Sequence, residues 1–453
     1  MKLMTATAAI ALGVTACGSN GEGEPTSAGD SSSLDFTTAP QGTVKTMGFN
    51  PSDEVGQSRA DLAAEALTDV DVEMDTSDFD AQKFAALSAA GTLPDVVQMD
   101  RNLVATFAQK GLIMPLDDCF VAHDVVPDEY WYPAVVQEAS WNGKVYAAPQ
   151  FYQPSLIIVN KRVADAAGVA LDDIDTSQPD RLLAAAQSMT ALSGAQPTTL
   201  GFDPDMPGSI ALWLEIFGGG VMDEEGKPTL DRAENIEALT YLTQLMDAQG
   251  GYAEVKSFKD TWDVFGDQNQ YVGDKVGAAT WAQWYINVLS NTKDTVELDA
   301  VPIRDLDGEA FAMAGGTAFA IPAAAKNPVG GCAWITRVTS LEAWEAAGDA
   351  RAATVQEKNS IVTGLFTGSP AADQAVRDAH VVPSGIEGFD KMIETSYEIL
   401  ADTRTVGSSP VGQQINDALK NAAGVALSKE KSPEEALVEA QATALREWEA
   451  LES

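Results

Sequence analysis

The sequence predicts an α/β fold in two domains, and three observations lead to this prediction. The chain has 453 residues, which is more than one hydrophobic core usually organises. Its composition, 45% hydrophobic and 21% charged, is ample for globular cores and excludes a wholly disordered chain. Strand and helix patterns alternate over residues 44–101, as they do in mainly parallel sheets covered by helices.

Apolar periodicity assigns each element of this alternation. It predicts strands over 44–49, 70–74 and 93–99, one helix after the polar loop 50–54, and a second helix that ends at Gly91. The third strand runs into Asp100 and Arg101. Because ligands of such sheets bind at the carboxyl ends of the strands, the loop 50–54 and the Asp100–Arg101 pair are expected beside a ligand.

The rest of the chain continues in the same style without a fixed repeat. Strands are predicted over 144–148, 156–159, 275–280 and 318–321, and helices over 181–191, 234–247 and from 413 onward. Pro433 stands near the first position of the last helix, and Glu434 and Glu435 occupy the first turn, where the helix dipole favours acids.

The charge of the chain is strongly one-sided. There are 28 Lys and Arg residues against 67 Asp and Glu residues, which gives a formal net charge of −39. A field of this sign repels nucleic-acid phosphates and anionic lipid head groups, so we expect no nucleic-acid partner. Beyond this, an acidic surface indicates only that the protein is well solvated.

The amino terminus has the features of a secretory signal. Lys2 precedes a short apolar run over 6–14, which is too short for a bilayer that takes roughly 20 apolar residues. The residues 14–17, Val-Thr-Ala-Cys, resemble the lipobox of bacterial lipoproteins. This resemblance implies that residues 1–16 are removed, that Cys17 is lipidated and that 17–42 form a flexible tether. An ordinary signal peptide with an incidental cysteine is the alternative.

Two cysteines remain besides Cys17. In an oxidising compartment, Cys119 and Cys332 are most simply explained by one disulfide. Two buried free thiols are the alternative.

Motifs for catalysis or metal binding do not occur in a usable form. The sequence has no HExxH, CxxC or GxSxG. Residues 220–227 have the wrong glycine spacing for a P-loop, and Pro228 stands where a magnesium-binding Ser or Thr belongs. A calcium loop from Asp203 would need Glu at position 214, which is Leu. We expect no enzyme, cofactor or metal, although the many acids leave a carboxylate pair of a polysaccharide-acting enzyme open.

Aromatic residues stand at the ends of several predicted strands and in loops. Trp213, Trp281 and Trp284 have polar or Gly-rich neighbours, and such rings suit the C–H faces of a sugar as well as they suit packing. Packing is the expected role of the other tryptophans considered, which are Trp131, Trp141, Trp334, Trp344 and Trp448.

Six segments in order resemble extracellular solute-binding proteins of ABC importers, in the sugar-binding family that includes maltose-binding proteins. They are TLPDVVQMDR (92–101), AQKGLIMPL (108–116), WNGKVYAAP (141–149), LIIVNK (156–161), FGGGVMDEEGKP (217–228) and AGGTAFAIPAAAKN (314–327). The resemblance implies a two-lobed periplasmic-binding-protein-like fold of type II, with a hinge and a cleft between the lobes. It implies one lobe from 43–151 plus 302–327 and a second from 152–301 plus 328–453.

The resemblance also implies where a ligand binds. The implied ligand contacts are Asn50, Asp53, Glu54, Asp100, Arg101, Phe151, Tyr152, Gln153, Trp213, Glu215, Trp281, Trp284, Gly315 and Gly316. In this set, Arg101 would donate and Asp100 accept hydrogen bonds from sugar hydroxyls, and Trp284 would stack on a sugar ring. Gln153 replaces an acid found in some relatives, and no residue between Asp402 and Gln414 matches a contact of the family.

The resulting expectation is a monomeric, lipid-anchored binding protein on the extracytoplasmic face of the bacterial cell membrane. It would capture an oligosaccharide, deliver it to an ABC permease, and perform no chemistry itself. The alternatives are a binding protein for another solute, such as glycerol phosphate or a polyamine, and a surface enzyme that acts on polysaccharide.

Overall fold

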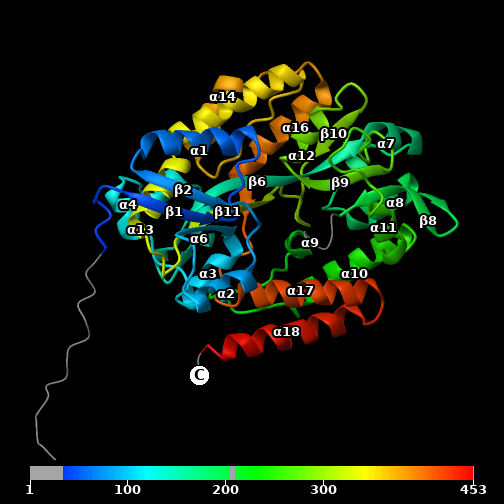
Figure 1. The fold of residues 1–453 in the computed structure, drawn as a ribbon. Helices are drawn as coiled ribbons and strands as arrows, with labels where there is room; N and C mark the ends of the chain where they lie inside the picture. The colour runs from blue at the N-terminus through cyan, green and yellow to red at the C-terminus, as the bar shows by residue number, and fades with distance from the viewer. Residues whose placement is uncertain (1–33, 205–209, 452–453) are drawn as a thin grey trace, which may run out of the picture. The chain divides into compact units, whose positions relative to one another are not determined.

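A mixed β-sheet connects two groups of helices in the computed structural model, which describes residues 34–204 and 210–451 (Figure 1). Residues 36–453 form one unit, and the description below concerns this unit alone. The expected signal peptide, Cys17 and the tether as far as residue 33 lie outside the described residues.

The strand order of the main sheet is β2-β1-β3-β11-β6-β9-β8-β7, with β10 added to β6 and β12 added to β11. The strands are β1 Gly42–Met47, β2 Val70–Asp75, β3 Val96–Asp100, β6 Ala147–Asn160, β7 Ala191–Ser193, β8 Gln196–Asp203, β9 Val276–Ala282, β10 Leu298–Val301, β11 Ala312–Ala320 and β12 Thr403–Arg404. A separate hairpin joins β4 Ser140–Trp141 to β5 Lys144–Val145.

The first lobe is built on the predicted alternation. The strand β1 pairs in parallel with both β2 and β3, and α1 and α2 connect them. Because side chains alternate along a strand, Val96 of β3 enters one core with Val44, whereas Val97 enters the core on the opposite face with Met47. The helices of this lobe are α1 Glu54–Ala66, α2 Ala81–Ala90, α3 Val104–Gln109, α4 Asp117–Ala122, α5 Pro127–Tyr130, α6 Pro133–Glu138, α13 Pro328–Val338, α14 Leu341–Lys358 and α15 Pro370–His380, with the 3-10 turn η1 Arg101–Leu103.

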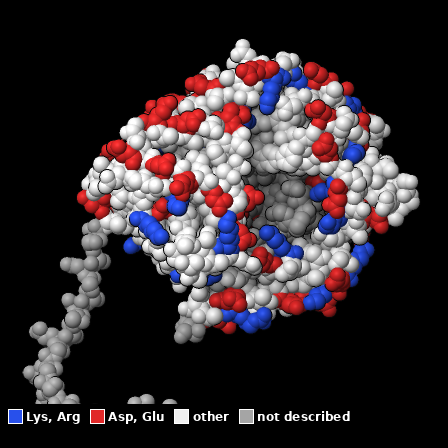
Figure 2. Space-filling view, viewed as in Figure 1, with Lys and Arg blue, Asp and Glu red and all other residues white. Residues whose placement is uncertain are grey.

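The second lobe forms around β7, β8, β9 and β10, with one core on each face of the sheet. Its helices are α7 Lys161–Ala167, α8 Pro179–Met189, α9 Ile210–Ile216, α10 Ala233–Ala248, α11 Tyr252–Lys259, α12 Tyr285–Ser290, α16 Glu387–Glu398, α17 Gly412–Leu427 and α18 Pro433–Glu449, with η2 Leu171–Asp173 and η3 Ile399–Asp402. Acidic side chains spread over both lobes on the face shown in Figure 2.

The sequence indicated a mainly parallel sheet, but the sheet is mixed. Two strands in its middle are responsible for this difference. The strand β6 pairs with β11 over 147–154 and with β9 over 155–159, so one continuous strand belongs to both lobes. Both pairings are antiparallel, and β11 is also antiparallel to β3. The connection between the lobes is therefore part of the sheet itself.

The boundary expected at residue 327 lies too early in the chain. The helices α13 and α14 pack against α1, and α15 packs against α14, so residues 328–380 join the first lobe. The physical reason is the ring of Trp334, which lies edge-to-face against Phe49 and Phe319 in the first-lobe core. Apolar periodicity gives a helix here but does not specify which of two cores receives its apolar face.

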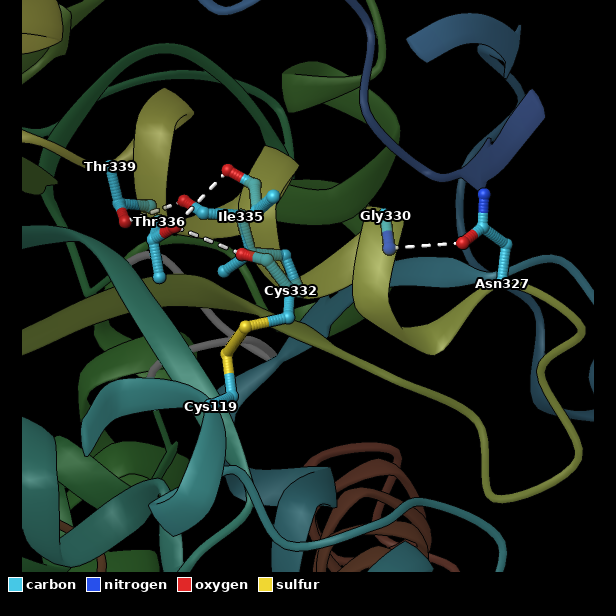
Figure 3. Close-up of a disulfide and its surroundings, with 8 residues drawn as sticks. Cys119, Asn327, Gly330, Cys332, Ile335, Thr336 and Thr339 are labelled. Atoms are coloured by element: carbon cyan, nitrogen blue, oxygen red, sulfur yellow. Dashed lines mark hydrogen bonds between the residues drawn. A yellow bond between two sulfur atoms is a disulfide. The ribbon is translucent and has the colours of Figure 1, made fainter. Parts of the chain in front are cut away.

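A disulfide joins Cys119 of α4 to Cys332 of α13, which is the pairing expected from the sequence (Figure 3). Their Cα atoms are 5.9 Å apart, and both cysteines are fully buried. Asn327 caps α13 by accepting a hydrogen bond from the Gly330 N–H at 3.0 Å (Figure 3). The cap stabilises the start of α13, and the disulfide holds α13 against α4 of the first lobe.

Within the parts of the chain that the structure describes, each helix is either too short or too polar to pass through a bilayer.

Replacing both Cys119 and Cys332 with Ala should lower the free energy of unfolding by about 2–5 kcal/mol, because the disulfide restricts the unfolded chain over a separation of 213 residues. Urea unfolding of the oxidised wild type and the double variant measures this difference. Equal midpoints and slopes for the two proteins would contradict the prediction.

Candidate functional site

A cavity of about 310 Å³ lies where the two lobes meet along the crossing strands. Figure 2 shows a hollow near the middle of this face, where Figure 1 places β6 and α9. Residues from six segments line the cavity: Asp100, Arg101, Asn102, Glu138, Ser155, Ala211, Leu212, Met313, Ala314, Gly315, Gly316, Arg404, Thr405 and Val406. Its volume is in the range of small-molecule sites.

A second cavity of similar size, about 340 Å³, lies between α2 and the strands β1 and β2. The first lobe alone forms it, and two exposed ion pairs, Lys45–Glu73 and Lys83–Asp75, border it. We assign the candidate site to the interlobe cavity, because convergent polar groups from both lobes are the feature that distinguishes a binding site from a surface groove.

Arg101 is the most constrained side chain of the interlobe cavity. It is 2% exposed, and each of its three nitrogens already donates a hydrogen bond within the protein. Nε donates to Glu138 at 2.7 Å, Nη2 donates to the Ala314 carbonyl at 2.9 Å, and Nη1 donates to the Phe151 carbonyl. Since Phe151 lies on β6 and Ala314 on β11, Arg101 ties the end of β3 to both crossing strands.

The backbone around Arg101 is closely packed. A Cβ atom at Gly316 would lie 2.0 Å from the Phe151 carbonyl oxygen and 2.2 Å from Arg101 Nη1, so glycine is required there. Phe151 itself has φ 62°, a left-handed conformation that is costly for a non-glycine residue. Gly315 has open space around it and contributes backbone to the cavity wall.

Asp100 lies at the carboxyl end of β3 and opens into the cavity. The surrounding walls desolvate its carboxylate, and this desolvation raises the pKa of Asp100 although the charges of Arg101 and Lys420 act to lower it. Asp100 remains exposed, so its carboxylate can accept hydrogen bonds from a ligand.

Trp281 and Trp284 form part of an aromatic cluster of the second lobe, and neither is among the residues that line this cavity. Ala282 lies between the two tryptophans in the sequence, and it pairs with Ser155, a residue that lines the cavity. The ring of Trp281 stacks on Tyr285 with centroids 3.9 Å apart, and that of Trp284 stacks on Phe265 at 6.0 Å. Phe265 is 72% exposed, so this part of the cluster presents ring surface to solvent.

The residues Asn50, Asp53 and Glu54 are not in this cavity. Asp53 caps α1 by accepting a hydrogen bond from the Gly56 N–H at 2.7 Å, and Arg351 forms ion pairs with both Asp53 and Glu54. Glu54 and Arg351 of the first lobe line a different and smaller cavity of about 200 Å³, and Asn287 of α12 lines it from the second lobe. Asn50 is exposed, and its side chain accepts a hydrogen bond from the Ser52 N–H.

The remaining expected contacts divide between core and cleft edge. Trp213 is 1% exposed, packs against Phe202 and Tyr241, and donates its Nε1–H to the Pro204 carbonyl at 3.3 Å, so it belongs to the second-lobe core. Tyr152 is fully buried with Arg101 5.4 Å above its ring, and burial raises its pKa to about 12.

Three other residues stay at the edge of the site. Phe151 packs edge-to-face against Trp344, and half-buried Gln153 pairs with Gly315 in the β6–β11 ladder. Glu215 lies one helical turn after the cavity residue Ala211, and burial raises its pKa. Its half-buried side chain lies near Gly220 of the Gly-rich segment, where a Cβ atom would be 3.4 Å from Glu215 Oε1.

Several cavity residues were not predicted from the sequence. They are Asn102, Glu138, Ser155, Ala211, Leu212, Met313, Ala314, Arg404, Thr405 and Val406. The strand β12 supplies one of them, Arg404, and Thr405 and Val406 directly follow it, in the interval where no residue matched a family contact. A strand of two residues has no periodicity, so only its pairing with β11 could have located it. Among the described residues, His, Cys, Asp and Glu form no group of three or more that could hold a metal ion.

Removing one partner of the ion pair between Arg101 and Glu138 should destabilise the protein strongly. Both side chains are below 10% exposed, and removing one partner of such a buried pair costs about 3–5 kcal/mol because the other charge stays unpaired. We expect Arg101→Met to lower the free energy of unfolding by this amount, and Arg101→Met with Glu138→Gln to recover part of it. Urea unfolding measures both, and unchanged stability of the single variant would contradict the prediction.

Comparison with known proteins assigns this chain to a protein family. A model of bacterial extracellular solute-binding proteins matches residues 36–352. An arabinooligosaccharide-binding protein of Halalkalibacterium halodurans is 27% identical over 163 residues, which are 36% of this chain and 35% of the relative. The matched part thus spans about one third of that relative's length.

Solved structures agree with the fold. A mannobiose-bound structure of the protein CpMnBP1 has a TM-score of 0.71 and 19% identity, covering 89% of this chain and 99% of that one. UgpB of Mycobacterium tuberculosis in complex with glycerophosphocholine has a TM-score of 0.64 and 17% identity, covering 89% and 98%. With a family model that matches most of its length, the chain belongs to the bacterial extracellular solute-binding proteins.

Proposed function

We propose that this protein captures a neutral oligosaccharide in the interlobe cavity and delivers it to the permease of an ABC importer. The observation that carries the proposal is the cavity itself, where hydrogen-bonding groups from both lobes converge. The second lobe also presents an exposed aromatic cluster, in which Trp284 stacks on Phe265. Sugars need both features, because their hydroxyls require donors and acceptors while their C–H faces pack on aromatic rings. The arabinooligosaccharide-binding relative and the mannobiose-bound neighbour support this class of ligand.

The charges of the cavity favour a neutral ligand over glycerol phosphate. Arg101 is paired with Glu138, and Arg404 is paired with Asp305, so both cations are compensated within the protein. Asp100 adds a negative charge at the same cavity. A phosphate group would be repelled there, even though UgpB shares the fold.

Capture requires movement of the lobes about their connecting strands. Binding of a sugar to groups on both lobes favours the closed arrangement and excludes water from the new hydrogen bonds. The protein performs no chemistry on the sugar in this scheme, and it acts as a monomer. Release to the permease then follows from reopening.

We also propose that Cys17 carries a lipid that anchors the mature chain on the extracytoplasmic face of the bacterial cell membrane. The lipobox-like residues 14–17 and the Gly/Ser-rich segment after them support this part of the proposal. Cys17→Ser should move the protein from the membrane fraction to the soluble fraction, and mass spectrometry should detect diacylglycerol on the wild type alone. A wild type without lipid mass would contradict the anchor.

Binding of an oligosaccharide is tested with a panel of mannobiose, mannotriose, maltose, arabinotriose, glycerol 3-phosphate and spermidine. We expect at least one of the sugars to stabilise the protein, by about 2.7 kcal/mol when its concentration is 100 times its Kd. We expect no stabilisation from the phosphate or the polyamine. Calorimetry and thermal unfolding measure both effects, and stabilisation by a charged solute alone would contradict the proposal.

Trp284→Ala should weaken binding of the best sugar at least tenfold, because loss of an aromatic anchor costs roughly 2 kcal/mol or more. Trp141→Ala is the matched control, since Trp141 is also partly exposed but lies on β4 with its Nε1–H bonded to Gln109. We expect the control to bind with wild-type affinity. Wild-type affinity in Trp284→Ala would place Trp284 outside the ligand contacts.

A further inference from the structure

Arg404 is a second arginine of the interlobe cavity, and two contacts fix its position. Its Nη2 donates a hydrogen bond to Asp305 Oδ2 at 2.5 Å, and its guanidinium carbon lies 4.1 Å from the centroid of the Phe311 ring. The ion pair and the ring contact restrict rotation of the long side chain. Part of the entropy that binding a ligand would otherwise cost is therefore already lost in the free protein.

The Arg404 side chain nevertheless remains open to solvent. It is 36% exposed, whereas the Arg101 side chain is 2% exposed. Within the described residues, the bond to Asp305 is the one hydrogen bond that the structure records for the Arg404 side chain, which leaves Nε and Nη1 for other acceptors. By contrast, all three nitrogens of Arg101 are engaged by Glu138 and two backbone carbonyls.

Asp305 holds Arg404 from the connection between β10 and β11. Its Oδ1 accepts hydrogen bonds from the Asp307 N–H at 3.1 Å and the Glu309 N–H at 3.0 Å, so the turn orients the carboxylate. Burial raises the pKa of Asp305, but the bonds from Arg404 and from the backbone outweigh burial and lower it overall. Asp305 therefore stays ionised and keeps Arg404 in place at neutral pH.

A complementary acceptor lines the same cavity. Asp100 comes from the first lobe, and Arg404 comes from β12, which pairs with the crossing strand β11. A sugar hydroxyl both donates and accepts hydrogen bonds, so a carboxylate and a guanidinium in one cavity can bind neighbouring hydroxyls. Thr405 adds a hydroxyl beside Arg404.

We propose that Arg404 is the ligand-binding arginine of this protein and donates hydrogen bonds to hydroxyls of a neutral oligosaccharide, with Asp305 as its positioning residue. In this arrangement Arg101 supports the crossing strands, and Arg404 performs the donor role that the sequence comparison assigned to Arg101. The inference rests on the proposed function, because it names a contact within the same cavity.

The first test compares variants in calorimetric titrations with whichever of mannobiose, mannotriose, maltose and arabinotriose binds the wild type most tightly. Arg404→Gln should weaken binding at least tenfold, because it removes a charged donor. The affinity of Arg404→Lys should fall between that of Arg404→Gln and that of the wild type, because lysine keeps the charge but lacks the planar guanidinium group. Asp305→Asn should also weaken binding. Arg232→Gln is the control, because Arg232 is similarly exposed, pairs with Glu234 and is not among the residues that line the cavity, and we expect its affinity within twofold of wild type.

The second test uses the wild-type protein, so it does not depend on the folding of a variant. Phenylglyoxal modifies accessible arginines, and peptide mass spectrometry reports each site separately. We expect Arg404 to react in the free protein and to react at least tenfold more slowly with saturating sugar. Arg101 should stay unmodified in both conditions.

The outcomes separate this inference from the proposed function. If a sugar binds but Arg404→Gln keeps wild-type affinity, or if the sugar leaves the modification rate of Arg404 unchanged, Arg404 is not a ligand contact and the proposed function stands. If none of the four sugars binds the wild type, the proposed function fails and this inference fails with it.

Discussion

The buried guanidinium of Arg101 is the interaction on which the arrangement of the two lobes depends. A charge in the protein interior is costly unless it is paired and fully hydrogen-bonded. Arg101 meets this requirement by binding Glu138 and the carbonyls of Phe151 and Ala314, which lie on the two crossing strands. Because this one buried charge must be compensated, Arg101 holds the end of β3 against both β6 and β11.

The connection that Arg101 makes between these strands also determines how the cavity is built. Because β6 is continuous through both lobes and β11 pairs beside it, these strands contribute to the floor of the cavity, while its walls belong to different lobes. Asp100 and Gly315 lie on β3 and β11, and Ala211 and Leu212 come from α9 of the second lobe. A ligand that touches both walls gains contacts as the lobes approach, which is how affinity can depend on closure.

The sequence predicts those parts of the fold that local patterns determine. The alternation of β1, α1, β2, α2 and β3 follows from apolar periodicity, and the cysteine count leads to the bond between Cys119 and Cys332. Asp100 and Arg101 come together at the end of β3 because the end of a strand is a local property.

Tertiary packing decides the features that sequence patterns miss. Trp213 looks like a ligand contact because polar residues and glycines follow it, but α9 directs its ring into the core against Tyr241. Asp53 looks like a free carboxylate, yet it caps α1. Arg404 lies on a strand of two residues, and only pairing with β11 brings it to the cavity. The measurement that tests the central claim most directly is small-angle X-ray scattering of the wild type with and without its tightest-binding oligosaccharide. Closure of the lobes around the sugar predicts a smaller radius of gyration in the bound state, and an unchanged radius at saturation would contradict capture by closure.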